Sequence, residues 1–281
     1  MTGCPAAKVT AVREDIHPEP GRVGADATVD EALRLAPELG AEPQLVRDHL
    51  ALLPTRYTAV VTPRAVVRHS LMARTRPGPT DVRTRVTPGR RGLDESGGID
   101  ELDVVALDHP GWFSKVAGVV AMHGGSIRAA DAFARADGLA VDTFRIRPPG
   151  GVAGSWWALV EGDLADAAAG RLAVRARVRR VARAQASRLA RFPTVTTRVA
   201  VLEPTDDATV IEVHTLDRLG VLFAISSALA ELELDIVVAR VQTMDHEVVD
   251  VFELRDGDGG PLADDHLAEL ELAITEAIAE L

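Results

Sequence analysis

Two short loops in this sequence carry residue types that suit the binding of a small anion. Each runs from an aspartate to a glycine three residues later, from Asp108 to Gly111 and from Asp217 to Gly220. Apolar residues recur at helical spacing after each glycine, so a helix is predicted to begin there. A glycine lets a ligand approach the backbone closely, and the first N–H groups of a helix lie at the positive end of its dipole. The sequence therefore predicts two candidate anion sites.

The two loops belong to an internal repeat with a spacing of 109 residues. Leu107–Val120 reads LDHPGWFSKVAGVV, and Leu216–Leu229 reads LDRLGVLFAISSAL. Two predicted strands precede each loop, and after each loop come the helix, two further strands and a second helix. Each copy is thus predicted to fold as β-β-α-β-β-α, an α+β unit with antiparallel strands and helices on one face. We expect the leading strand to complete the sheet of its own copy or of its neighbour.

The predicted elements divide the chain into three parts, residues 1–79, 80–192 and 193–281. The first part is a flexible lead-in over residues 1–27 followed by short helices at Val29–Leu35, Gln44–Leu53 and Pro63–Ala73. The second part holds strands at Val82–Val86, Glu101–Leu107, Ser126–Arg135 and Leu139–Arg147, and a helix over Trp156–Ala182 broken at Gly170. The third holds strands at Val195–Val199, Thr209–Leu216, Asp235–Thr243 and Val248–Leu254, and a helix at Asp264–Leu281.

The composition excludes several classes of protein. The formal net charge of −11 disfavours nucleic-acid binding. No apolar run reaches the length of a membrane span, and the first residues lack the apolar block of a secretory signal. Cys4 is the single cysteine, which excludes an internal disulfide and a cysteine-based zinc site. We expect a cytoplasmic protein without a cofactor, a metal site or a membrane partner.

Charge is distributed unevenly along the chain. Residues 171–191 hold eight arginines and no acid, whereas residues 245–281 hold twelve acids and one arginine, Arg255. The two stretches could pair within a dimer or steer a charged partner, and the alternative is that each is a solvated helix face.

The motifs of the repeat resemble those of the ACT domain, a ferredoxin-like βαββαβ module found in regulatory proteins that bind amino acids. The D-x-P-G-x-φ loop of that family reads Asp108-His109-Pro110-Gly111-Trp112-Phe113 in the first copy. In the second copy it reads Asp217-Arg218-Leu219-Gly220-Val221-Leu222. The resemblance implies two ferredoxin-like modules with antiparallel sheets, preceded by a short helical segment.

A longer stretch, over about residues 44–281, is similar to the C-terminal part of PII uridylyltransferase/uridylyl-removing enzyme. In that family this region senses glutamine and sets the balance between two catalytic domains. The motifs of those catalytic domains are not found here: Gly124-Gly125-Ser126 is not followed by a D-x-D pair, and no His-Asp dipeptide occurs. We therefore expect a regulatory protein of nitrogen metabolism that is not an enzyme.

The resemblance also implies where an amino acid would bind. Its carboxylate would accept from N–H groups at the start of each helix, and its ammonium would need oxygen acceptors at the start of the next strand. Ser126 and Asp235 stand at that position, where the family often has Asn, and Leu219 replaces the loop proline in the second copy. Glutamine is the favoured ligand. The candidate ligand-binding residues are Asp108, His109, Pro110, Gly111, Trp112, Phe113, Ser126, Ile127, Asp217, Arg218, Leu219, Gly220, Val221, Leu222, Asp235 and Ile236.

Other interpretations stay open at this point. Asp108 and Asp217 could merely cap the helices, and Asp142 and Asp250 could contact a ligand or face solvent. The modules could be a ligand-free scaffold that pairs through sheets or helices. A uridylyltransferase-related enzyme is a further alternative. We expect a homodimer, and a regulatory protein partner is possible.

Overall fold

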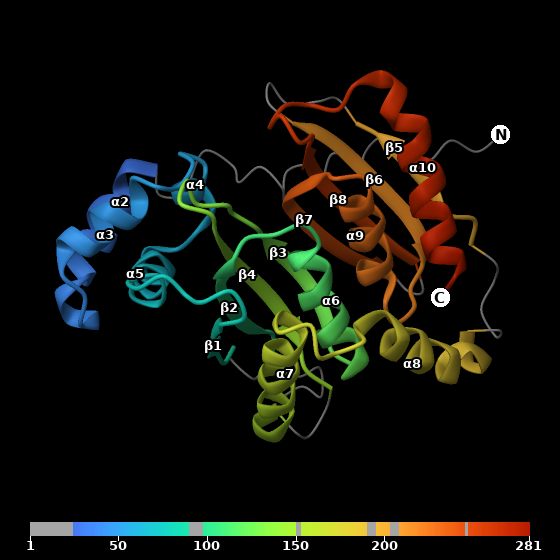
Figure 1. Cartoon of the computed structure of the whole chain (residues 1–281), viewed down its shortest axis with the longest axis horizontal. Coiled ribbons are helices and arrows are strands. Elements are labelled where there is room, and N and C mark those ends of the chain that lie inside the picture. The colour runs from blue at the N-terminus through green and yellow to red at the C-terminus, as the bar shows by residue number, and fades with distance from the viewer. Residues whose placement is uncertain (1–24, 90–97, 150–152, 190–194, 203–207, 245–246) are drawn as a thin grey trace.

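The computed structural model describes residues 25–89, 98–149, 153–189, 195–202, 208–244 and 247–281. They form an α+β molecule in which helices pack on an antiparallel sheet (Figure 1). The fold class predicted from the sequence is confirmed. The predicted lead-in over residues 1–27 lies outside the described residues, except for its last three, which are helical.

Both copies of the repeat have the predicted order of elements. The first copy comprises β1 (Val82–Thr87), β2 (Asp100–Leu107), α6 (Trp112–Met122), β3 (Ser126–Asp131), β4 (Leu139–Arg147), α7 (Ala153–Ala168) and α8 (Val174–Leu189). The second comprises β5 (Arg198–Val201), β6 (Thr209–Leu216), α9 (Val221–Glu231), β7 (Asp235–Met244), β8 (Glu247–Arg255) and α10 (Asp264–Ala279). The largest differences from the predicted bounds are that β3 ends at Asp131, β5 begins at Arg198, and α8 continues to Leu189 instead of ending at Ala182.

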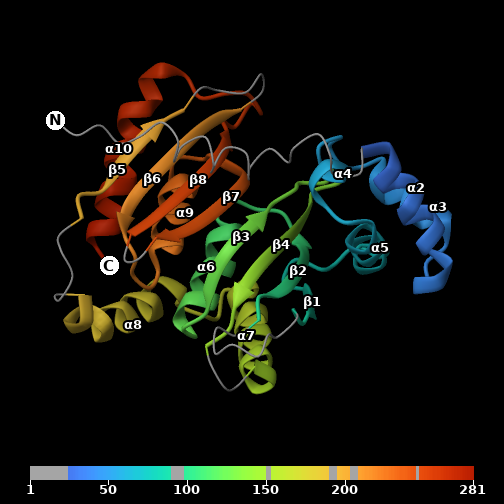
Figure 2. The same cartoon turned by 180° about the vertical axis from the view of Figure 1, so that it is seen from behind.

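The eight strands form one continuous antiparallel sheet in the order β1-β2-β4-β3-β7-β8-β6-β5 (Figure 2). Each leading strand pairs within its own copy, β1 with β2 and β5 with β6. The copies join where β3 pairs with β7, for example at Ala130 and Ala239. Because β3 and β7 are equivalent strands and run antiparallel, the copies face each other about an approximate two-fold axis. The ends of equivalent elements from opposite copies therefore lie close together.

The helices of the repeat cover one face of the sheet and enclose an aliphatic core. Leu102, Val104 and Ala106 alternate along β2 toward this face, as a half-buried strand requires. α6 and α9 pack against each other above the junction of the copies. Gly118 of α6 has no room for a side chain, because a Cβ there would lie 2.4 Å from Val174 and 2.7 Å from Phe223.

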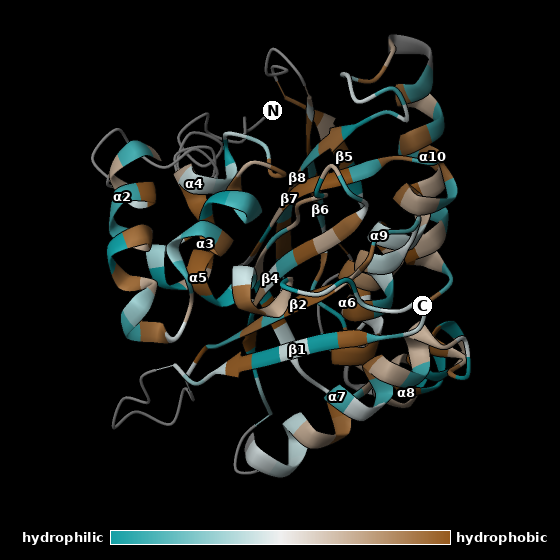
Figure 3. Ribbon diagram, turned by 60° about the vertical axis from the view of Figure 1, so that its left-hand side comes forward, coloured by the Kyte–Doolittle hydropathy of each residue, from teal (hydrophilic) through white to brown (hydrophobic). Residues whose placement is uncertain are grey.

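The N-terminal helices, which are not part of the repeat, cover the opposite face of the first copy. These helices are α2 (Ala25–Leu35), η1 (Pro37–Leu39), α3 (Pro43–Leu50), α4 (Tyr57–Val60) and α5 (Pro63–Met72). Figure 3 shows the three layers: these helices, the sheet, and the helices of the repeat. Val66 and Val67 of α5 form a second core with Val105 and Val141, whose side chains point away from the first core.

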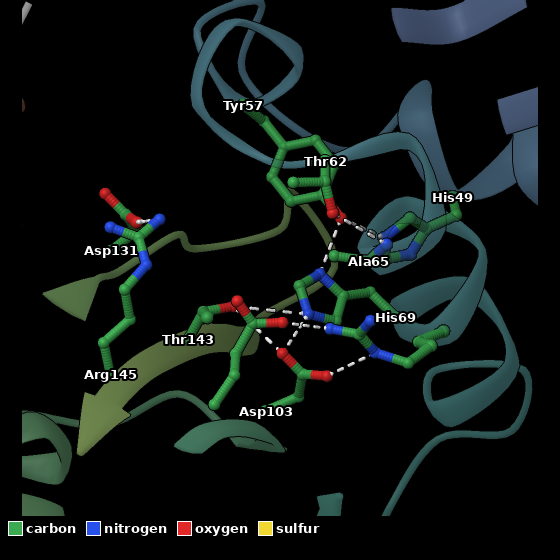
Figure 4. A network of polar contacts seen from close by, with 11 residues as sticks. His49, Tyr57, Thr62, Ala65, His69, Asp103, Asp131, Thr143 and Arg145 are labelled. Atoms are coloured by element: carbon green, nitrogen blue, oxygen red, sulfur yellow. Dashed lines mark hydrogen bonds and ion pairs between the residues drawn. The ribbon is translucent and has the colours of Figure 1, made fainter. Parts of the chain in front are cut away.

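A buried ion pair joins these N-terminal helices to the sheet (Figure 4). Asp103 of β2 is fully buried and accepts from Arg68 Nε at 2.7 Å, and its Oδ1 lies 3.0 Å from His69 Nε2. Burial alone would raise the pKa of Asp103, but hydrogen bonds and charge from His69 and Arg68 outweigh it and lower the pKa to about 2.

One ion pair joins the arginine-rich stretch to the acidic stretch within the chain, between Arg179 of α8 and Glu280. Arg175 bonds Glu231 of α9, outside the acidic stretch, while Arg180 and Arg183 are exposed. These are surface ion pairs, each worth at most about 1 kcal/mol. In the described part of the chain no helix is long and apolar enough to cross a membrane.

Candidate functional site

Both candidate loops place a glycine in the left-handed region at the start of a helix. Gly111 has a φ of 77° and precedes α6, and Gly220 has a φ of 91° and precedes α9. Other residues adopt this conformation only with strain, so the glycines are required by the turn. The N-cap residue of each helix is this glycine and not the aspartate three residues before it. The alternative that Asp108 and Asp217 serve as caps is therefore wrong.

The turn itself uses one N–H group of each helix. The N–H of Trp112 donates to the carbonyl of His109 at 3.1 Å, and the N–H of Val221 donates to the carbonyl of Arg218 at 3.2 Å. The N–H groups that the first helical turn leaves for an anion are those of the next two residues. In the first copy these belong to Phe113 and Ser114.

Each loop lines a cavity together with a strand of the opposite copy. The first cavity, of about 930 Å³, contains residues 108–114 of the first copy and residues 233–237 of the second. The second, of about 200 Å³, contains residues 217–223 of the second copy and residues 124–127 of the first. Eight of the sixteen candidate residues line each cavity. Asp235 thus accompanies Asp108, and Ser126 accompanies Asp217, as the antiparallel junction of β3 and β7 dictates.

Four carboxyl groups line the first cavity, those of Asp108, Asp142, Glu233 and Asp235. Asp142 of β4 is buried beneath it, and burial together with the charge of Asp108 raises the pKa of Asp142 well above its usual value. Burial, the nearby Asp108 and the opposing Arg255 together leave the pKa of Asp235 raised. Burial also raises the pKa of Asp108. Asp108 raises the pKa values of both Asp142 and Asp235, so a cation placed among these three groups would be stabilised.

The second cavity holds a single deeply buried carboxyl group. Asp250 of β8 is 1% exposed, and its Oδ1 has no hydrogen-bond partner among the described residues. Burial and the charge of Asp217 raise its pKa well above the usual value. Burial raises the pKa of Asp217 as well, and Arg128 partly opposes this.

Asp142 and Asp250 do not face solvent, so that interpretation of the two residues is wrong. They lie on the helix-covered face of their strands, two residues before the core residues Phe144 and Phe252. The sequence could not decide between the two faces, because apolar residues occur on both faces of these strands, as Val141 and Phe144 do in β4.

The N-terminal helices supply a third wall of the first cavity, which sequence reasoning missed. Residues 51–54, between α3 and α4, line it, and so does Arg135 from the turn between β3 and β4. The carbonyl of Leu52 accepts from the N–H of Ala136 at 2.8 Å and holds this wall in place. No local sequence pattern predicts such a contact between segments more than eighty residues apart.

The eight histidines do not assemble a metal site in the part of the chain that the structure describes, where no three His, Cys, Asp or Glu residues are grouped to hold an ion. His49 and His69 are buried in the contact between the N-terminal helices and the sheet.

Comparison with known proteins places this geometry in a family context. No family model matches the chain. A bifunctional uridylyltransferase/uridylyl-removing enzyme of Rhodospirillum rubrum is 32% identical over 260 residues, which is 87% of this chain and 27% of the relative. The enzyme of the same name from Gluconobacter oxydans is 37% identical over 167 residues, covering 57% of this chain and 17% of the relative. That of Azospirillum brasilense is 29% identical over 241 residues.

The chain is homologous to part of the uridylyltransferase/uridylyl-removing enzymes. The resemblance found in the sequence is thereby confirmed, and the chain spans about a quarter or less of the length of these three relatives. The alignment that covers 87% of the chain is longer than residues 80–281, so it includes part of the N-terminal helices. Those helices and the repeat therefore occur together in the relatives.

Proposed function

We propose that this chain is a regulatory, non-catalytic region that senses an amino acid, with glutamine the favoured ligand. The observation that carries the proposal is the first cavity, which combines a helix N-terminus from one copy with carboxyl groups from both. An α-amino acid presents one carboxylate and one ammonium on the same carbon, and this cavity offers a matching partner for each.

In the proposed complex the carboxylate accepts from the N–H groups of Phe113 and Ser114. The glycine at position 111 leaves the approach open, and the helix dipole favours the negative charge. The ammonium donates to Asp108 and Asp235, with Asp142 beneath them. Because Asp235 comes from the opposite copy, a bound ligand would bridge the two modules.

The choice of glutamine rests on the resemblance to the ACT domain and to a glutamine-sensing region, and on no contact in the structure. The relatives are named for uridylyl transfer and removal, so the role we propose for this region is to regulate such activities in nitrogen metabolism, in the cytoplasm. The regulated activities and a regulatory protein partner belong to the proposal.

Isothermal calorimetry with the twenty amino acids, each at millimolar concentration, tests the proposal. Glutamine is expected to bind, and Gly111→Val is expected to abolish the heat because a side chain would occupy the path to the helix N-terminus. Gly170→Val is a matched control, since Gly170 also has a positive φ, a Cβ there meets nothing within 4 Å, and the residue lines neither cavity. If none of the twenty amino acids gave a heat of binding with the wild-type chain, amino-acid sensing would be refuted.

A ligand-free scaffold is the second candidate, and the continuous sheet favours it, because backbone pairing of β3 with β7 joins the two copies directly. A homodimer would then use other surfaces, such as the outer strands β1 and β5 or the helices. Sedimentation of the full chain with and without glutamine distinguishes the candidates. A scaffold gives the same mass in both, whereas a sensor coupled to its dimer state changes mass.

A further inference from the structure

The wall that residues 51–54 contribute to the first cavity belongs to a segment that also reaches both copies of the repeat. We define the N-terminal segment as residues 43–72, which comprise α3, α4 and α5. Three sets of contacts connect it to the cavity: the hydrogen bond between Leu52 and Ala136, a side-chain network that begins at Arg135, and the ion pair of Arg56 with Glu253. The second cavity is lined by no residue of this segment.

Arg135 lies at the point where cavity and segment meet. Its Nε and Nη2 donate to the two oxygens of Asp137 at 3.0 and 2.8 Å, which fixes the guanidinium in a bidentate pair. Its Nη1 donates to Nδ1 of the buried His49 at 3.0 Å. Burial lowers the pKa of His49 to about 3, with smaller contributions from the charges of His69 and Arg135, so the ring is neutral and can accept this bond.

The contacts continue from His49 through the segment to the sheet (Figure 4). His49 Nε2 lies 3.4 Å from the hydroxyl of Tyr57, and that hydroxyl lies 2.7 Å from Nδ1 of His69. His69 in turn pairs with Asp103 of β2. All of these side chains are buried, so a displacement of Arg135 cannot be absorbed by water and must be accommodated by its neighbours.

Arg56 ties the same segment to the second copy. Its Nη1 donates to Glu253 at 2.7 Å and its Nη2 to the carbonyl of Val237 at 3.0 Å, while its guanidinium lies 5.5 Å from the ring centre of Phe133. Val237 and Phe133 both line the first cavity. The segment therefore contacts the cavity wall on the side of each copy.

We propose that the packing of the N-terminal segment changes when a ligand binds in the first cavity. Arg135 and Arg56 are the positioning residues that transmit this change. The second cavity does not contact the segment. A ligand that bridges Phe113 and Asp235 would fix the spacing of the two copies. Since the segment is attached to both, its packing changes with that spacing. The inference rests on the proposed function, because it needs an amino acid in the cavity.

Hydrogen–deuterium exchange of the full chain tests the inference, with the twenty amino acids supplied one at a time, beginning with glutamine. Binding is expected to slow exchange in residues 43–72 by at least about threefold. Arg56→Ala, at a residue that does not line the cavity, is expected to keep calorimetric affinity within about threefold and to lose most of that slowing. Arg135→Ala, measured at a saturating concentration of the amino acid so that any change in affinity is overcome, is also expected to lose most of that slowing. Gly111→Val is expected to lose both binding and slowing.

Arg83→Ala provides the matched control. Arg83 of β1 also holds the segment, through the carbonyls of Met72 and Thr75, but it does not line the cavity, so its loss is expected to leave the response unchanged. Binding of an amino acid with unchanged exchange in residues 43–72 would overturn this inference and leave the proposed function standing. Absence of any binding would overturn both. A response lost equally in the Arg83 and Arg135 variants would assign it to general loosening of the segment and overturn the roles of the two arginines.

Discussion

The two cavities descend from the same repeated motif, yet they differ in size, charge and surroundings. The first measures about 930 Å³, is lined by four carboxyl groups and borders the N-terminal helices. The second measures about 200 Å³ and lies where Val178 of α8 approaches Gly220. The repeat fixes the loop and its helix, whereas segments outside the repeat decide how open each loop is. Duplication of a motif therefore does not imply duplication of a site.

The largest difference between the two loops is expected in their tolerance of a side chain at the glycine. A Cβ on Gly220 would lie 2.7 Å from Val178, whereas the nearest atom to a Cβ on Gly111 is Ser114 Oγ at 3.6 Å. Both substitutions strain a positive φ by about 1–2 kcal/mol, and the crowded site adds about 1–3 kcal/mol. Urea unfolding is expected to show a greater loss of stability for Gly220→Ala than for Gly111→Ala. Equal losses would mean that α8 does not close the second loop.

The buried carboxyl of the second cavity is expected to destabilise the folded chain at neutral pH. The pKa of Asp250 is raised, so the folded state binds the proton of this carboxyl more tightly than the unfolded state does. The free energy of unfolding therefore falls as the pH rises above the ordinary pKa of 3.8. Asp250→Asn is expected to raise the free energy of unfolding by about 2 kcal/mol at pH 7. The gain should disappear near the ordinary pKa of the carboxyl, and a gain of the same size at both pH values would contradict this account.

Recognition across the copies can be tested with one residue from each cavity. Asp235→Ala is expected to weaken amino-acid binding at the first cavity at least about tenfold, or about 1.4 kcal/mol, because the ammonium loses an acceptor. Ser126→Ala, at the equivalent position of the other copy, is expected to leave that affinity unchanged. Calorimetry that gave the reverse result would mean that each loop works with its own copy.

A further difference concerns His49, which bonds Arg135 in the wall of the first cavity and has no counterpart at the second. Its pKa is lowered from 6.5 to about 3, so between these values the unfolded chain binds a proton that the folded chain does not. The free energy of unfolding should therefore fall as pH falls through this window, by up to about 1.4 kcal/mol per pH unit from this residue. Unfolding measured at several pH values is expected to show a shallower slope for His49→Gln than for the wild-type chain. Identical slopes would show that His49 accepts protons when folded.

Much of the fold followed from the sequence because the repeat and the strand alternation are local signals. The bounds of Thr209–Leu216 agree with the prediction, and the glycine turns at 111 and 220 follow from a positive φ that few other residues adopt. The junction of β3 and β7 could not be predicted, since an edge strand carries no mark of its partner. For the same reason the sequence identified the residues of both cavities without showing how they are shared between the copies.

The central claim is that the first cavity binds an amino acid between the two copies, and titration of the ¹⁵N-labelled chain with glutamine tests it most directly. The account predicts that the amide signals of Phe113, Ser114 and Asp235 shift together and report one dissociation constant. A shift confined to one copy, a shift only at residues 217–223, or no shift at saturating glutamine would contradict it.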